Sequence, residues 1–114
     1  MLDGAITIGR GAGTRALVDS RWSRFCLVTV ELARSYAPVI YVQNRGLGQW
    51  DGQPEENFVV IFGGVTNSDP AALCSQLRWL ARKFDQDGIA LLLGSSELIT
   101  PLAHAVEEGA AHVS

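Results

Sequence analysis

Apolar residues recur every three or four positions in two stretches of the chain, residues 19–36 and residues 70–84. Such spacing places apolar side chains on one face of a helix and is typical of a helix that packs on a core. The recurring positions are Trp22, Phe25, Thr29, Leu32 and Tyr36 in the first stretch, and Leu73, Leu77, Leu80 and Phe84 in the second. The pattern therefore predicts two amphipathic helices.

The residues at the ends of both stretches support helices of this length. Asp19 or Ser20 can cap the first helix, and Ala37-Pro38 ends it, because a residue before proline disfavours the helical conformation. Asn67-Ser68-Asp69-Pro70 is a strong start signal for the second helix. A strand over residues 25–30, which are rich in β-branched side chains, competes with the first helix. The length of the stretch and its cap favour the helix.

Shorter apolar runs predict the strands. Residues 39–44, 57–62 and 89–93 are apolar, and residues 5–8 form a further short β-prone run. Residues 45–56 contain three glycines and a proline, so we expect a long exposed loop between two antiparallel strands. Residues 57–62 and 89–93 flank a helix, and such a crossover makes two strands parallel if they are neighbours in the sheet.

These elements predict a single globular domain over residues 1–114, of the α+β class. We expect a small mixed β-sheet with two main helices packed on it in a two-layer sandwich, and a last short helix that starts near residue 94. Composition agrees, because 114 residues with 47% hydrophobic and 18% charged side chains are typical of one globular domain. No apolar run reaches about 18 residues and no signal-peptide pattern is present, so we expect no membrane contact.

Cysteine, histidine and motif content predict little chemistry. Cys26 and Cys74 lie in apolar runs, so we expect buried, reduced thiols and a cytoplasmic location. A Cys–His nucleophile pair with His104 or His112 is the alternative. These four residues have no metal-ligand spacing, and motifs of hydrolases, metalloproteases and P-loop NTPases are absent. We therefore expect no catalytic residue, no metal and no cofactor.

Charge is unevenly distributed along the chain. The net charge is −3, which argues against a general nucleic-acid coat and direct nucleic-acid contact. Residues 1–45 carry six arginines and three acids, a balance of +3, whereas residues 46–114 carry three cations and nine acids, a balance of −6. Such asymmetry is typical of an interaction surface, or of helix and loop faces that simply alternate in sign.

The first candidate site is the glycine-rich run that follows residues 5–8. Between a strand and a helix, such a loop can direct backbone N–H groups at a phosphate. The residues that would bind it are Arg10, Gly11, Gly13 and Arg15. The spacing of Gly9, Gly11 and Gly13 matches neither a dinucleotide fingerprint nor a P-loop. A purely structural glycine-rich turn is the alternative.

The second candidate site is the expected loop before residues 57–62. It places an aromatic side chain beside three carboxylates on one segment, and Arg45 begins that segment. The candidate partner-binding residues are Arg45, Trp50, Asp51, Glu55 and Glu56. The alternatives are a folded-over loop in which Trp50 packs as a lid, and a carboxylate pair used for a metal or for acid–base catalysis.

These segments also carry a resemblance to a group of proteins. Glu55-Glu56-Asn57 after Trp50, an apolar strand, an amphipathic helix and then Phe84-Asp85-Gln86 before another apolar strand resemble small uncharacterised proteins of bacteria and phages. The resemblance covers about residues 36–98, and Asp87-Gly88 departs from it where an apolar run would start at once. It implies an accessory protein of a phage or mobile element, such as an inhibitor of a host defence complex of the anti-CRISPR type.

Taken together, these features favour a non-enzymatic binding protein that acts through contact with a protein partner. An acidic surface can compete with nucleic acid for a basic protein site, so the partner we expect is a protein, for example a nucleic-acid-binding defence complex. The alternative is a small-molecule or nucleotide-binding domain, with or without enzymatic activity, that uses the Gly9–Gly13 loop. A homodimer that buries an apolar face is a further expectation.

Overall fold

The computed structural model describes residues 2–65, 70–95, 97, 99 and 101, and of Trp50 it describes the backbone alone. Its elements are β1 (Leu2–Gly9), the 3-10 turn η1 (Gly13–Arg15), α1 (Asp19–Tyr36), β2 (Val39–Trp50), β3 (Gln53–Val65), α2 (Pro70–Lys83) and β4 (Ala90–Gly94). Both predicted helices are confirmed, and the competing strand over residues 25–30 is wrong. The last helix expected near residue 94 and the cap signal at residues 67–69 lie mostly outside the described residues.

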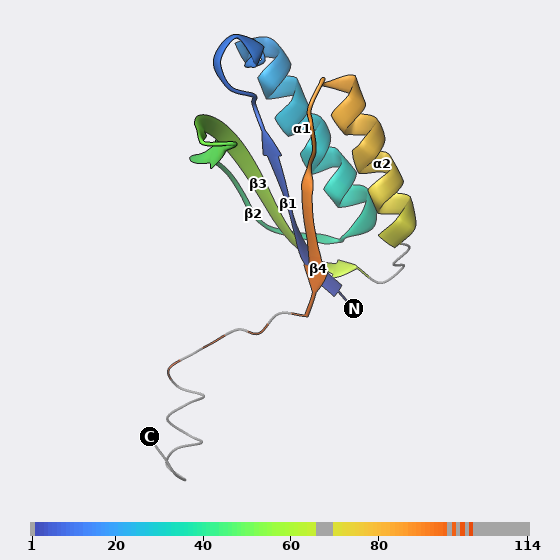
Figure 1. Cartoon of the computed structure of the whole chain (residues 1–114). Coiled ribbons are helices and arrows are strands. Elements are labelled where there is room, and N and C mark those ends of the chain that lie inside the picture. Colours follow the sequence, from blue (N-terminus) through green and yellow to red (C-terminus); the bar gives the residue numbers. More distant parts are fainter. Residues whose placement is uncertain (1, 66–69, 96, 98, 100, 102–114) are drawn as a thin grey trace.

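The four strands form one sheet in the order β2-β3-β1-β4 (Figure 1). Every neighbouring pair is antiparallel, so the expectation of a mixed sheet is wrong. Strands β3 and β4 do run in the same direction, as their connection through α2 predicts, but β1 lies between them. The short run at residues 5–8 is therefore the middle of a central strand. This βαββαβ order is the split βαβ, or ferredoxin-like, arrangement.

The segment between the second and third strands is a hairpin and not a long loop. Strands β2 and β3 extend to Trp50 and Gln53, which pair with each other across a two-residue turn. The turn residues Asp51 and Gly52 have φ values of 52° and 77°, as a type I′ turn requires. An Asp-Gly pair is a strong signal for this turn. The segment therefore forms a hairpin, although its glycines and its proline favour a loop.

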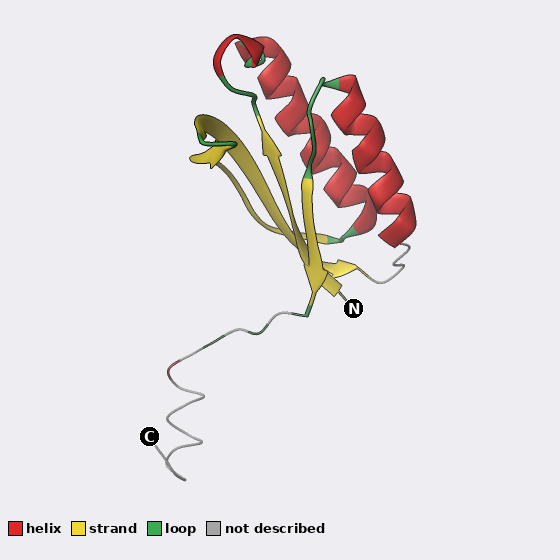
Figure 2. Ribbon diagram, viewed as in Figure 1, coloured by secondary structure: helices red, strands yellow, loops and turns green. Residues whose placement is uncertain are grey.

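Both helices pack on one face of the sheet, so the two-layer α+β sandwich is confirmed (Figure 2). Alternate residues of the two central strands face the helices, because side chains along a strand point to opposite sides. The largest buried side chains are Ile6 and Ile8 of β1, Val60 and Phe62 of β3, Trp22 and Phe25 of α1, and Leu80 of α2. No helix of the described residues lies on the opposite face of the sheet.

Two further findings concern the helices. Val18 and not Asp19 or Ser20 is the N-cap of α1, and Asp19 is the first helical residue. Its carboxylate instead binds Arg10 of the preceding loop. Among the helices of the described residues, none combines the length and the apolar character that a membrane crossing needs.

Candidate functional site

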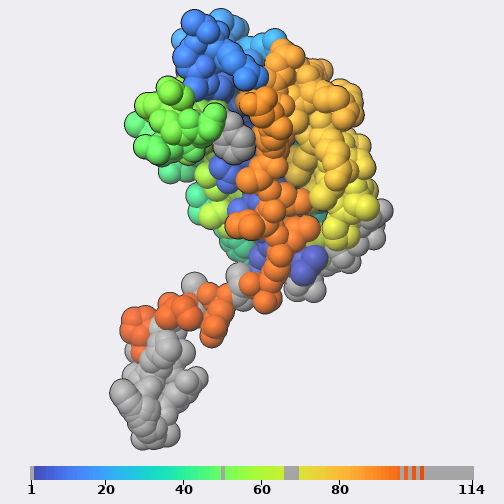
Figure 3. Space-filling model, viewed as in Figure 1, coloured from blue at the N-terminus to red at the C-terminus, as the bar shows by residue number. Residues whose placement is uncertain are grey.

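Three chain segments meet around a cavity of about 570 Å³ at one end of the sheet. They are the tip of the β2–β3 hairpin, the loop between β1 and α1, and the segment from α2 to β4 (Figure 3). We call this space the tip cavity. It brings together residues from both candidate sites of the sequence, since Gly11, Arg15, Asp51 and Glu55 all line it.

Glu55 links the hairpin to the loop after β1. One carboxylate oxygen accepts a hydrogen bond from the backbone N–H of Gly11 at 2.8 Å. The carboxylate lies so close over Gly9 that a Cβ there would be 2.5 Å from it, and Gly11 has a φ of 95°. Glycine at position 9 therefore lets the carboxylate lie in this place, and glycine at position 11 suits the positive φ of the backbone. The glycine-rich loop holds a carboxylate of its own chain.

Arg10 fastens the other side of the same loop. Its guanidinium donates to Glu56 at 2.6 Å and to Asp19 at 2.6 Å, and its Nε donates to the carbonyl oxygen of Leu17 at 2.7 Å. The hydrogen bond to Glu56, followed by that to Asp19, raises the pKa of Arg10 above its ordinary value. Arg10 thus ties the loop to the hairpin and to the start of α1.

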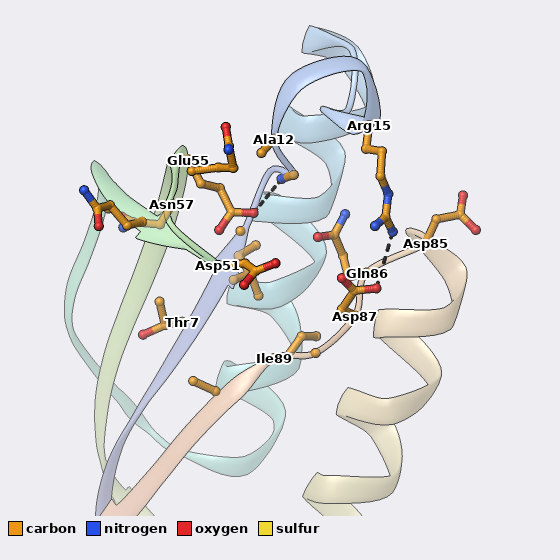
Figure 4. A pocket seen from close by; sticks show the side chains of 18 residues that line it. Thr7, Ala12, Arg15, Asp51, Glu55, Asn57, Asp85, Gln86, Asp87 and Ile89 are labelled. Atoms are coloured by element: carbon orange, nitrogen blue, oxygen red, sulfur yellow. Dashed lines mark hydrogen bonds and ion pairs between the residues drawn. The ribbon is translucent and has the colours of Figure 1, made fainter.

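The third wall of the tip cavity comes from the end of α2. The Phe84 ring is buried and stacks on Phe25 with ring centroids 4.5 Å apart. Asp85 then takes a φ of 55°, and this left-handed residue ends the helix. The chain turns, so that Gln86 and Asp87 line the cavity, where Asp87 accepts a hydrogen bond from Arg15 at 3.3 Å (Figure 4).

The lining of the tip cavity is acidic and rich in amides. Four carboxylates and one guanidinium line it, a net charge of −3, although the Asp85 carboxylate points away from the space (Figure 4). The charged residues are Asp51, Glu55, Asp85, Asp87 and Arg15, and the amides are Gln49, Gln53, Asn57 and Gln86. No group of three or more His, Cys, Asp or Glu within the described part of the chain is placed to hold a metal ion.

Several predicted site residues lie elsewhere. Arg10, Gly13 and Glu56 line a smaller neighbouring cavity of about 310 Å³, which shares Gly11 and Glu55 with the tip cavity. Arg45 lies on β2, where its guanidinium is 3.4 Å from the hydroxyl of Ser23 on α1. The Trp50 side chain lies outside the described residues, as do both histidines.

In the sequence, the glycine-rich loop and the acidic segment are separate candidate sites, and no pattern predicts a binding role for Asn57, Gln86 or Asp87. The separation of about 40 residues along the chain hid their contact. A signal was present for Asn57, because its side-chain atoms lie against Gly46 and Gly48 on β2, where a Cβ would be 3.0 and 2.7 Å away. The alternate glycines leave room for the amide on the sheet.

Comparisons of the chain with protein-family models, with curated proteins and with solved structures found no match.

Proposed function

We propose that this chain is a non-enzymatic binding protein that takes a cationic group of a protein partner, an arginine or lysine side chain, into the tip cavity. The observation that supports this most is the meeting of three separate segments around one ligand-sized space with excess carboxylate. Binding pockets of about 300–1,000 Å³ with a few converging polar groups are typical of ligand sites. The excess negative charge favours a cation.

The chemistry of the lining suits a guanidinium group. Within the described residues Asp51 has no hydrogen-bond or ion-pair partner, so its carboxylate can bind an incoming cation. Glu55 is fixed by the N–H of Gly11 through one of its oxygens. A carboxylate accepts about four hydrogen bonds, and planar guanidinium groups bind such oxygens in pairs. Asn57 and Gln86 add neutral acceptors around them.

The same contacts weigh against phosphate binding by the glycine-rich loop, the alternative from the sequence. The N–H of Gly11, which would face a phosphate, already binds Glu55, and Arg10 and Arg15 are paired with carboxylates. An anion placed there would meet these carboxylates at close range, and like charges repel. The tip cavity thus supports a cationic ligand better than a nucleotide.

The volume of the tip cavity favours one second candidate, a free cationic small molecule such as a polyamine. The protein partner remains the preferred ligand, because the hairpin tip presents the carboxylates on an exposed surface. An accessory protein of a phage or mobile element that inhibits a host defence complex is one form of this function, in which the carboxylates take the place of nucleic-acid phosphates on a basic partner. A cytoplasmic location belongs to the same proposal.

Calorimetry with an arginine-rich peptide tests the proposal, with a glutamate-rich peptide and spermidine as comparison ligands. Asp51→Asn and Glu55→Gln remove charge and retain a hydrogen-bond acceptor, so the fold is expected to persist. We expect each to weaken binding of the arginine peptide by about tenfold or more. The matched control is Glu31→Gln, an exposed carboxylate on α1.

Equal losses in Glu31→Gln and Glu55→Gln, or no binding by the native chain at millimolar peptide, would overturn the proposal. Tighter binding of spermidine than of the peptide would favour the small-molecule candidate.

A further inference from the structure

The face of the sheet opposite the helices carries a second surface of interest. Ile6 and Val60 point to the helices, so the residues next to them along each strand point to the opposite face. Cross-strand pairing places Val42 opposite Ile61, and Leu92 opposite Ala5, on that same side. We define the outer patch as Ala5, Val42, Val59, Ile61, Ala90 and Leu92.

The outer patch is apolar and free of charge, and its residues are exposed except for the half-buried Ala5 and Val59. Leu92 is 72% exposed, Val42 44% and Ile61 38%. Thr7 of β1 and Asn44 of β2 lie on the same face, on either side of Val59, with which both pair. Their side chains are polar but uncharged. Exposed apolar side chains gathered on one flat surface are typical of an interaction site.

We propose that a second copy of this chain docks on the outer patch, face to face across a two-fold axis. A two-fold interface places the same patch on both copies, so the patch must match itself. A patch of apolar and neutral side chains can pack against an identical patch, because no charge then faces an identical charge or is buried without a partner.

The size of the face suits such a dimer. The neutral part of this face runs from Asn57 to Gly63 on β3, because Glu55 lies on the same face at one end and Asp3 at the other. With about 3.3 Å per residue and about 4.8 Å between strands, this part is about 23 Å long and 19 Å wide, a flat footprint on the order of 400 Å². The protruding side chains add to the accessible area and bring it toward the roughly 600 Å² per partner of small interfaces, so we expect a weak dimer.

The chemistry of the patch disfavours a nucleic acid as occupant. Nucleic acids are bound mainly through lysine and arginine contacts to phosphates, and no patch residue is basic. The outer patch is also distinct from the residues that carry the proposed cation site. It borders the tip cavity, since Thr7, Asn57 and Ala90 belong to both the outer face and the cavity lining. A docked copy therefore lies near the mouth of the tip cavity.

Analytical ultracentrifugation of the full chain, from low micromolar to millimolar protein, tests this dimer. We expect a concentration-dependent dimer, with a dissociation constant raised at least about 100-fold by Leu92→Glu, because a charge would then be buried at the interface. Val42→Glu, on a different strand, should have the same effect. The matched control is Leu27→Glu, since Leu27 is 55% exposed on α1 and lies away from the sheet; its dimer should be unchanged.

A native chain that stays monomeric throughout this range would overturn the proposal, and the patch would then be left for another protein or for the chain's own residues beyond Gly94. A dimer that survives both glutamate variants would also overturn it. Circular dichroism of each variant shows that dissociation is not unfolding. Glu55→Gln should leave the dimer intact, so failure of the cation site and failure of the dimer are distinguishable.

Discussion

Phe84 is buried in the core, and the residues that follow it line the tip cavity. The substitution Phe84→Ala therefore tests how much this packing contributes to stability. The ring is 2% exposed, stacks on Phe25 at an interplanar angle of 10°, and lies 5.5 Å below the guanidinium carbon of Arg21. Truncation removes the buried ring and leaves a space between the two helices. Substitutions of this kind lower the free energy of unfolding by about 3–5 kcal/mol.

Such a loss is large for a chain of this size. Domains are typically stable by about 5–15 kcal/mol, and each kcal/mol corresponds to about 4 °C or more in Tm for a domain near 100 residues. We therefore expect Phe84→Ala to lower Tm by roughly 12–25 °C in thermal unfolding followed by circular dichroism. Urea denaturation at fixed temperature gives the free energy directly.

The matched control is Trp79→Ala on the solvent side of the same helix. Trp79 is 50% exposed and has the Lys83 ammonium 5.0 Å from its ring centroid. Its loss should cost less than about 1 kcal/mol, the usual range for an exposed cation–π pair. If Phe84→Ala costs no more than Trp79→Ala, Phe84 does not carry the packing assigned to it here.

Three further predictions concern single positions. Gly4→Ala should lower the free energy of unfolding by about 1–3 kcal/mol in urea denaturation, because the new Cβ would lie 2.5 Å from the carbonyl oxygen of Leu92; an unchanged midpoint would contradict this. Asp85→Gly should match or exceed the Tm of the native chain. The free energy of unfolding of Asp85→Val should be lower than that of the glycine variant by about 1–2 kcal/mol, because the φ of 55° strains a β-branched residue. Equal Tm values for the two variants would refute the reasoning. Burial raises the pKa of the Cys26 thiol, so iodoacetamide at about pH 8 should label the half-buried Cys74 first and Cys26 only on unfolding. Peptide mass mapping measures the labelling of each thiol. Equal labelling rates in the folded chain would be inconsistent with a buried Cys26.

Local patterns determined the helices well and the hairpin poorly. The bounds of α1 match the predicted residues 19–36, because its apolar face is long and a proline follows its end. The two strands of the hairpin are longer than predicted, because the glycines and the proline of residues 45–56 favour a loop and the turn signal at Asp51-Gly52 is only two residues long. The short apolar run at residues 5–8 gave no sign that β1 is central, because sheet order depends on contacts between distant segments.

The candidate site shows the same limit. In the sequence, Glu55 and Gly11 belong to two opposing hypotheses, a partner-binding carboxylate and a phosphate-binding glycine. The hydrogen bond between them joins the two hypotheses into one site. The expected charge of the ligand changes from negative to positive as a result, because carboxylates of the same chain already bind the loop. Only the pairing of β1 with β3 brings these residues within reach of each other.

The most direct test of the tip cavity as a cation site is an NMR titration of the ¹⁵N-labelled chain with an arginine-rich peptide. Saturable shift changes are expected at the backbone amides of Gly11, which donates to Glu55, and of Asp51 and Asp87 around the same space. Saturable shifts confined to the exposed side of α1, for example around Leu27, with no change at Gly11, would contradict the proposed site.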